Sequence, residues 1–171
     1  QPSVGRERRA VAMVGAGALG TWVGLALGLS GVGSERHIDD EDHIDESNLN
    51  RQVLFVDAIG QCKAPVLAAR LQLLFPGMKL CGYGMAADAN SSQYIGRSTV
   101  LAACPDNFVA RAFLNSLAQH RKKILINGGT SAMGGSCMTY VPGCTACLSC
   151  RLNIDRLALR ETRSRSCAQV E

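Results

Sequence analysis

A short apolar run, AVAMV (residues 10–14), leads directly into the pattern Gly15-x-Gly17-x-x-Gly20. A loop with this spacing makes a tight turn, lets its backbone approach a phosphate closely, and packs the next helix against the strand. The free N–H groups at the start of that helix attract the anion. The pattern predicts a nucleotide site, although a glycine turn without a ligand can have the same spacing.

An acidic residue about 20 positions after the glycine loop is the second feature of such a site. Asp40 stands at this spacing from Gly20. Its carboxylate can accept hydrogen bonds from a ribose. Because NAD and ATP both contain ribose, the two features together fit hydride transfer and ATP chemistry equally well.

Basic residues follow in the segments DEDHIDESNLNRQVLF and IGQCK, which contain Arg51 and Lys63. Such cations suit an enzyme that attacks the α-phosphate, because negative charge grows there in the transition state. A hydride-transfer enzyme has no need of them, since its glycine loop already holds the phosphates. Two other interpretations stay open: Arg51 could pair with the acidic residues before it, and Lys63 could be a solvated lysine in the first turn of a helix.

Asp106 directly follows STVLAAC (98–104), a segment that is typical of a buried strand. Ligands of open parallel sheets bind at the carboxyl ends of the strands. A carboxylate at that edge can hold Mg²⁺ that bridges phosphate oxygens. Asp106 could instead cap the helix that begins near Asn107, because Asp is a favoured capping residue.

Strand-like and helix-like segments alternate along the chain. This alternation predicts an α/β fold: a doubly wound, mostly parallel, Rossmann-like sheet with helices on both faces. The segment around 36–39 is unusually polar for a buried strand, and Trp22 is expected in the core of the first helix. We expect strands at 11–14, 36–39, 79–83, 98–104, 123–129 and 135–141, and helices at 18–29, 64–75 and 107–120.

The motifs GAGALG, D-x-D, SNLNRQ, GQCK, PDN and CxxC occur in this order between Val11 and Cys147. Together they resemble the ThiF/MoeB family of adenylyltransferases, which is related to ubiquitin-activating enzymes. The resemblance implies that the C-terminal carboxylate of a ubiquitin-like or sulfur-carrier protein attacks the α-phosphate of ATP, giving an acyl adenylate and pyrophosphate. The alternatives are a non-catalytic scaffold half of a heterodimeric activating enzyme and an NAD-dependent oxidoreductase.

The same resemblance implies roles for single residues. Asp106 would hold Mg²⁺ and act in catalysis together with Arg51 and Lys63, and Asn107 and Arg111 complete its motif. Asp40 would bind the ribose. The residues implied to bind ATP are Gly15, Gly17, Gly20, Asp40, Asp42, Asn48, Arg51 and Lys63.

The chain has 8 cysteines. Four are scattered singly, as buried reduced thiols usually are; these are Cys62, Cys81, Cys104 and Cys137. Cys144-x-x-Cys147 resembles the first half of the family's structural zinc site, which implies Zn²⁺ at these two thiolates. Cys150 and Cys167 could complete a local site, all of these thiols could be free, or Cys167 could receive the activated carrier.

At 171 residues the chain fits one domain. We expect an ATP-binding adenylation domain at 1–143 and the incomplete start of a cysteine-rich or crossover region at 144–171. The net charge of +4 is mild, and the basic residues lie near the two ends without interleaved aromatics, which argues against nucleic-acid binding. Glycines recur through the apolar stretch 10–29, so we expect no membrane span and a cytoplasmic protein.

The resemblance further implies a homodimer in which one subunit lends an arginine to the other's site. The segment GRERR (5–9) could supply that arginine. The glycine-rich segment 126–136 is expected to offer an open sheet edge. Glycines let an extended peptide approach backbone to backbone, so this edge would bind a carrier protein that ends in glycine.

Overall fold

A computed structural model describes residues 10–33, 35–131 and 133–168. Within these ranges, one sheet has the strand order β3-β2-β1-β4-β5-β6. The first five strands in chain order pair in parallel, and β6 is antiparallel to β5. This is the doubly wound, Rossmann-like arrangement that the sequence predicts. The strands are β1 (Ala10–Val14), β2 (Glu35–Asp39), β3 (Lys79–Tyr83), β4 (Val100–Ala103), β5 (Ile124–Ser131) and β6 (Gly134–Tyr140).

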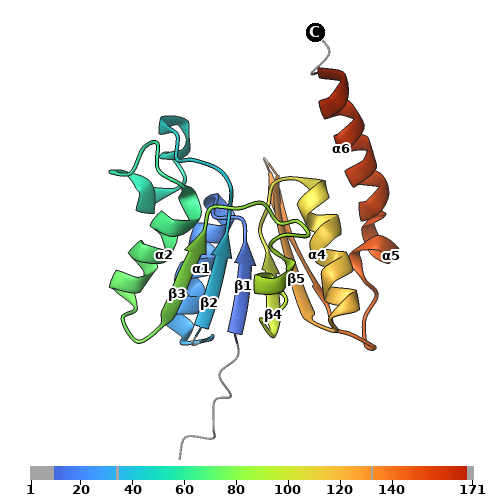
Figure 1. Ribbon diagram of the computed structural model, residues 1–171, viewed down its shortest axis with the longest axis horizontal. Coiled ribbons are helices and arrows are strands. Elements are labelled where there is room, and N and C mark those ends of the chain that lie inside the picture. The colour runs from blue at the N-terminus through green and yellow to red at the C-terminus, as the bar shows by residue number, and fades with distance from the viewer. Residues whose placement is uncertain (1–9, 34, 132, 169–171) are drawn as a thin grey trace, which may run out of the picture.

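Helices cover both faces of the sheet (Figure 1). Helices α1 (Ala18–Ser30) and α2 (Lys63–Leu74) lie on one face, and α4 (Phe108–His120) lies on the other. Helices α5 (Leu148–Leu152) and α6 (Ile154–Ala168) pack against α4. The remaining elements are the short helix α3 (Ser92–Ile95) and the 3-10 turns Glu46–Asn48 and Val53–Phe55. No helix in the described ranges is long and apolar enough to cross a lipid bilayer.

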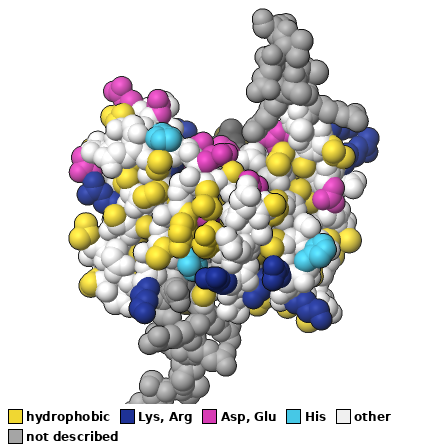
Figure 2. All heavy atoms as spheres, viewed as in Figure 1, with side chains coloured by type: hydrophobic (Ala, Val, Ile, Leu, Met, Phe, Trp, Pro, Cys, Tyr) yellow, Lys and Arg dark blue, Asp and Glu magenta, His cyan; other side chains and the backbone are white. Residues whose placement is uncertain are grey.

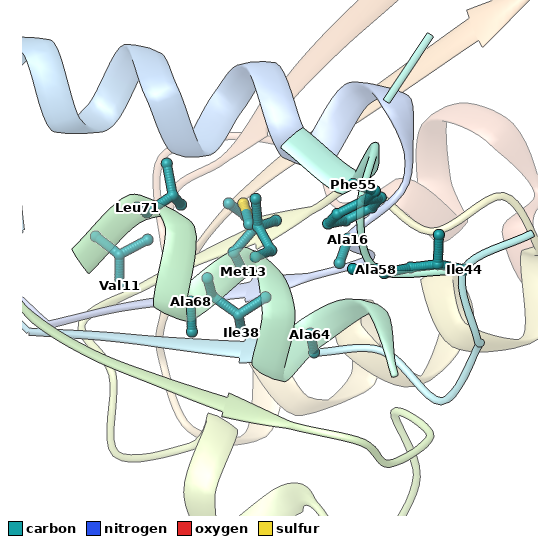
Figure 3. Close-up of a cluster of buried hydrophobic side chains, with 12 residues drawn as sticks. Val11, Met13, Ala16, Ile38, Ile44, Phe55, Ala58, Ala64, Ala68 and Leu71 are labelled. Atoms are coloured by element: carbon teal, nitrogen blue, oxygen red, sulfur yellow. The ribbon is translucent and has the colours of Figure 1, made fainter. Parts of the chain in front are cut away.

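Alternating side chains of the central strands form two hydrophobic cores. Val11 and Met13 face α1 and α2, whereas Ala12 and Val14 face α4. Figure 3 shows the first core, which extends beyond the sheet to Phe55 and other residues of the loop between β2 and α2. This buried anchor fixes the loop that carries the predicted phosphate-binding residues.

Strand β2 is buried in spite of its polar sequence. The side chain of Arg36 is only 2% exposed, and one of its Nη2 hydrogens reaches the carbonyl oxygen of Val32. The prediction for Trp22 is wrong, because this side chain is 56% exposed. Gly20, Gly24 and Gly28 form the buried side of α1, which places Trp22 on the outer side.

Two further expectations also need correction. Cys81 and Cys137 are exposed, not buried, because both lie on the outermost strands of the sheet. The glycine-rich segment 126–136 is largely a hairpin rather than an open edge, because most of its described residues belong to β5 and β6, which pair with each other. The edge strand on that side of the sheet is β6.

Candidate active site

The glycine loop joins β1 to α1 at the carboxyl edge of the sheet. Gly15 has a φ of +97°, and a Cβ there would lie 2.5 Å from the carbonyl carbon of Cys104. A Cβ on Gly20 would collide with the carbonyl oxygen of Gly15. At Gly17, by contrast, the nearest atom to an added Cβ would be Nε2 of Gln52, at 3.8 Å. Gly15 and Gly20 therefore permit the turn, and Gly17 leaves open space above the loop.

Asp40 is hydrogen-bonded directly to this loop. Its Oδ2 accepts from the N–H of Ala16 at 2.6 Å, and its Oδ1 accepts from the N–H of Asp42 at 2.9 Å. Burial raises the pKa of Asp40, and these hydrogen bonds together with the charge of Lys63 oppose that shift. The carboxylate lies beside the first turn of α1, where an acid that binds ribose is needed.

Lys63 begins α2 and is paired with Asp42. Its Nζ lies 2.8 Å from Oδ2 of Asp42, and its N–H donates to the carbonyl oxygen of Asp42 at 2.9 Å. Lys63 is only 7% exposed, so the interpretation as a solvated lysine is wrong. The site thus contains a nearly buried cation whose partner carboxylate faces solvent.

Asn48 and Arg51 lie in the loop between β2 and α2. The Oδ1 of Asn48 accepts from the N–H of Asp45 and closes a 3-10 turn. Arg51 is exposed, and its Nη1 donates to the carbonyl oxygen of Ser47 at 3.0 Å and to Oδ1 of Asn50 at 2.8 Å. No ion pair among the described residues joins Arg51 to the acidic run before it. Its charge is therefore available at the rim of the site.

Two buried polar side chains near the loop have unpartnered oxygens within the described structure. Gln52 is 3% exposed and its Oε1 has no hydrogen-bond partner, while its Nε2 lies 3.8 Å from the position of a Cβ added to Gly17. Both carboxylate oxygens of Asp39 are also unpartnered, and burial raises the pKa of Asp39 to about 7. Sequence reasoning gave neither residue a role, although Asp39 could have been noted as an acid at the end of a strand. The amide of Gln52 beside an open cradle fits a bound triphosphate.

Asp106 follows β4 and is exposed. It does not cap α4: the cap is Asn107, whose Oδ1 accepts from the N–H of Ala110 at 2.7 Å. The alternative role of Asp106 as a helix cap is therefore wrong. The carboxylate of Asp106 has no hydrogen-bond partner among the described residues, although the charge of Arg111 acts on it. It can provide one ligand to Mg²⁺, which is usually held by one or two carboxylates together with substrate phosphates.

Two groups of hydrogen bonds, one from Arg111 of α4 and one from Glu161 of α6, hold the start of α4 and the loop before it. The Nη1 of Arg111 donates to Oδ1 of Asn127 and to the carbonyl oxygen of Gly128, both at 2.6 Å, and its Nη2 reaches the carbonyl oxygen of Pro105. From α6, Oε2 of Glu161 accepts from the N–H groups of Phe108 at 2.6 Å and Val109 at 3.3 Å. The loop that carries Asp106 is thus fixed by β5 on one side and by α6 on the other.

The structure brings most of the predicted site residues to one edge of the sheet. The N–H of Gly15 donates to the carbonyl oxygen of Asp39, and Gly15 touches the end of β4 just before Asp106. Arg51 lies on the exposed rim of this edge. Figure 2 shows acidic side chains gathered along the upper margin of the molecule.

The cysteine cluster lies elsewhere, at the start of α5. Cys144 is exposed, and Cys147 is buried with its Sγ 3.8 Å from Sγ of Cys150. The described residues contain no group of three or more His, Cys, Asp or Glu that could hold a metal ion. A structural zinc site needs four ligands, so the described part of the chain supplies no complete one, and the side chain of Cys167 lies outside it.

Comparison with known proteins agrees with the geometry. The model of the ThiF family matches residues 6–170. The sulfur carrier protein ThiS adenylyltransferase of Bacillus subtilis (strain 168) is 34% identical over 152 residues, which cover 86% of this chain and 45% of that protein. The enzyme of the same name from Escherichia coli (strain K12) is 32% identical over 144 residues, covering 81% of this chain and 57% of that protein.

A relative from a different activation system is also similar. The ubiquitin-like modifier-activating enzyme 7 of Homo sapiens is 32% identical over 149 residues, which cover 81% of this chain and 15% of the human protein. The chain therefore spans only a part of the length of each of these relatives.

Proposed function

The chain belongs to the ThiF family, and we propose that it is the nucleotide-binding part of an ATP-dependent adenylyltransferase. Its acceptor would be the C-terminal carboxylate of a ubiquitin-like or sulfur-carrier protein. The single observation that supports this most is the meeting of Lys63, Asp106 and the open cradle above Gly17 at one sheet edge. The curated relatives are named for the activation of such carriers.

The chemistry follows from the charges at this edge. The glycine loop and the N-terminus of α1 would hold the phosphates, and Asp40 would hold the ribose. Lys63, Arg51 and Asn48 would contact the α-phosphate as an acceptor carboxylate attacks it and pyrophosphate leaves. Cations placed there stabilise the charge that develops in the transition state. Asp106 would hold Mg²⁺, which neutralises phosphate charge.

Both alternative functions explain less. An NAD-dependent oxidoreductase leaves the nearly buried Lys63 and the exposed Asp106 without a task. A scaffold half of a heterodimeric enzyme has no reason to keep Arg51, Lys63 and Asp106 together. Pyrophosphate exchange distinguishes both alternatives from an adenylyltransferase, because neither an oxidoreductase nor a scaffold exchanges pyrophosphate into ATP.

The proposal also covers the oligomeric state and the location of the protein. We propose a homodimer in the cytoplasm, with Arg6, Arg8 or Arg9 contributed across the interface; these residues lie outside the described ranges. Sedimentation of the complete protein at micromolar concentration checks this, and an active monomer that tolerates substitution of all three arginines would contradict it. The division of the chain at 143/144 stays a prediction.

The deciding experiment is carrier-dependent exchange of pyrophosphate into ATP by the complete protein. Asp106→Ala should bind ATP normally and lose about 10²- to 10³-fold in exchange rate, because a contact specific to the transition state is removed. Asp57→Ala is the matched control, since Asp57 is an exposed carboxylate that pairs with Arg70. Near-normal exchange by Asp106→Ala would reject the assignment.

A further inference from the structure

The first three backbone N–H groups of α4 donate to two different side chains. Asn107 caps the helix, and its Oδ1 accepts from the N–H of Ala110 at 2.7 Å. The N–H groups of Phe108 and Val109 both donate to Oε2 of Glu161 on α6, at 2.6 and 3.3 Å. A helix leaves its first N–H groups without partners of its own. Here a carboxylate that stands 53 positions after Phe108 provides the acceptor for two of them.

Asp106 is the carboxylate that lies nearest to these two donors in the sequence. The N–H of Phe108 belongs to the second residue after Asp106, and the N–H of Val109 to the third. An aspartate side chain readily accepts from N–H groups at these two offsets, in an Asx-turn. The local sequence therefore favours a contact that would draw the carboxylate of Asp106 onto the start of α4.

Other aspartates of this chain make that local contact. Oδ1 of Asp88 accepts from the N–H groups two and three positions later, at 2.8 and 3.3 Å. Oδ1 of Asp45 accepts from the N–H two positions later, at 2.8 Å. In the described structure Asp106 makes neither contact, and the N–H groups of Phe108 and Val109 donate to Glu161 instead. The long-range acceptor thus replaces the local one at this helix.

We infer that Glu161 is a positioning residue: it occupies the N–H groups of Phe108 and Val109 and so keeps the carboxylate of Asp106 available to Mg²⁺. The magnesium role of Asp106 belongs to the proposed function, and this part of the inference rests on it. A carboxylate oxygen that accepts backbone hydrogen bonds has fewer lone pairs to offer to a metal ion. Removal of Glu161 therefore gives Mg²⁺ a competitor for Asp106.

Amide hydrogen exchange, measured by NMR on the complete protein without nucleotide or metal, tests this competition. In Glu161→Ala, exchange at Phe108 and Val109 should stay within about threefold of the parent, because Asp106 takes over as acceptor. In the double variant with Asp106→Ala, exchange at both positions should be about tenfold faster, because no carboxylate remains. Asp106→Ala alone should change neither position. The N–H of Ala110, which has a separate acceptor, is the internal control and should exchange equally in all variants.

The magnesium requirement provides the functional readout. In carrier-dependent pyrophosphate exchange, Glu161→Ala should raise the free Mg²⁺ concentration at half-maximal rate about tenfold, the factor that corresponds to one hydrogen bond to a charged group. Most of the rate should return at saturating Mg²⁺. Glu161→Gln keeps an acceptor oxygen and should stay within about twofold of the parent. Asp155→Ala, which removes an exposed acid of the same helix, is the matched control and should behave as the parent.

Several outcomes would overturn the inference. Exchange at Phe108 and Val109 that becomes fully fast in Glu161→Ala alone, or that stays slow in the double variant, would show that the two carboxylates do not compete. A magnesium requirement that rises equally in Asp155→Ala would do the same. The expected exchange pattern with an unchanged magnesium requirement would retain the competition and reject the magnesium role of Asp106. A parent protein with this exchange pattern but without pyrophosphate exchange would reject the proposed function alone.

Discussion

Lys63 and Asp42 lie 21 positions apart in the sequence, yet Nζ of Lys63 lies 2.8 Å from Oδ2 of Asp42. Lys63 is nearly buried, whereas 58% of the side chain of Asp42 is exposed. The pair holds a cation in place beside the proposed phosphate site.

Lys63→Gln should abolish most of the activity and change stability little. Removal of a charge contact at a developing anion lowers the rate by about 10²- to 10³-fold. The ion pair itself contributes at most about 1 kcal/mol, because its acidic partner is solvated. Carrier-dependent pyrophosphate exchange and urea unfolding measure the two effects. Lys79→Gln, at an exposed position of β3, is the control; an equal loss of rate in both variants would contradict the role of Lys63.

Substitution of Gly15 should lower the free energy of unfolding, whereas substitution of Gly17 should weaken ATP binding. Gly15→Ala places a side chain in a left-handed conformation and against Cys104, so it should lower the free energy of unfolding by roughly 1–2 kcal/mol from the backbone alone. Gly17→Ala meets no such obstacle. Its free energy of unfolding should stay within about 0.5 kcal/mol of the parent, while ATP binding weakens, as measured by calorimetry. Unchanged ATP affinity in Gly17→Ala would show that the open space is not the phosphate cradle.

Asp39 should make stability depend on pH. Burial raises its pKa from 3.8 to about 7, so the folded state binds its proton more tightly than the unfolded state. The resulting stabilisation is fully present below about pH 4 and is lost as the pH rises through 7, by at most about 4 kcal/mol. Asp39→Asn removes this dependence and should be more stable than the parent protein above pH 7. Urea unfolding between pH 5 and 8 measures the difference, and parallel curves for both proteins would contradict the prediction.

The complete protein should contain about one zinc ion per chain, with Cys144 and Cys147 among its ligands. Cys144→Ser and Cys147→Ser should each reduce the zinc content in elemental analysis and lower the Tm. Cys137→Ser, which changes an exposed cysteine on β6, should do neither. Full stability of a metal-free protein in which both Cys144 and Cys147 are serine would reject the zinc site.

Local patterns were sufficient to predict most of the sheet. The glycine loop lies where the spacing of Gly15, Gly17 and Gly20 predicts, and β3 has the predicted bounds. Helix α6 was not predicted, because arginines interrupt its apolar residues. Trp22 was misplaced since an apolar helix shows no preferred face until the glycines that contact the sheet are identified.

The candidate site depended more on contacts between distant segments. Asp106 and Asn107 are adjacent and both can cap a helix, so only the observed hydrogen bond to Ala110 distinguishes them. The burial of Lys63 depends on Asp42, and no local pattern predicts that pairing. Oε1 of Gln52 and both carboxylate oxygens of Asp39 have no hydrogen-bond partner in the described structure. This too depends on the folded chain and has no local sequence signal.

The hydrogen bonds from α4 to Glu161 set the rotational phase of α6. Each residue of an α-helix turns the next by about 100°, so one residue inserted between Asn153 and Glu161 would swing this carboxylate away from Phe108 and Val109. Four inserted residues, slightly more than a full turn, would restore the direction but move the carboxylate about 6 Å along the helix axis, out of reach of both N–H groups. The first turn of α4, immediately after Asp106, therefore fixes both the rotation of α6 and the number of residues that precede Glu161 in it.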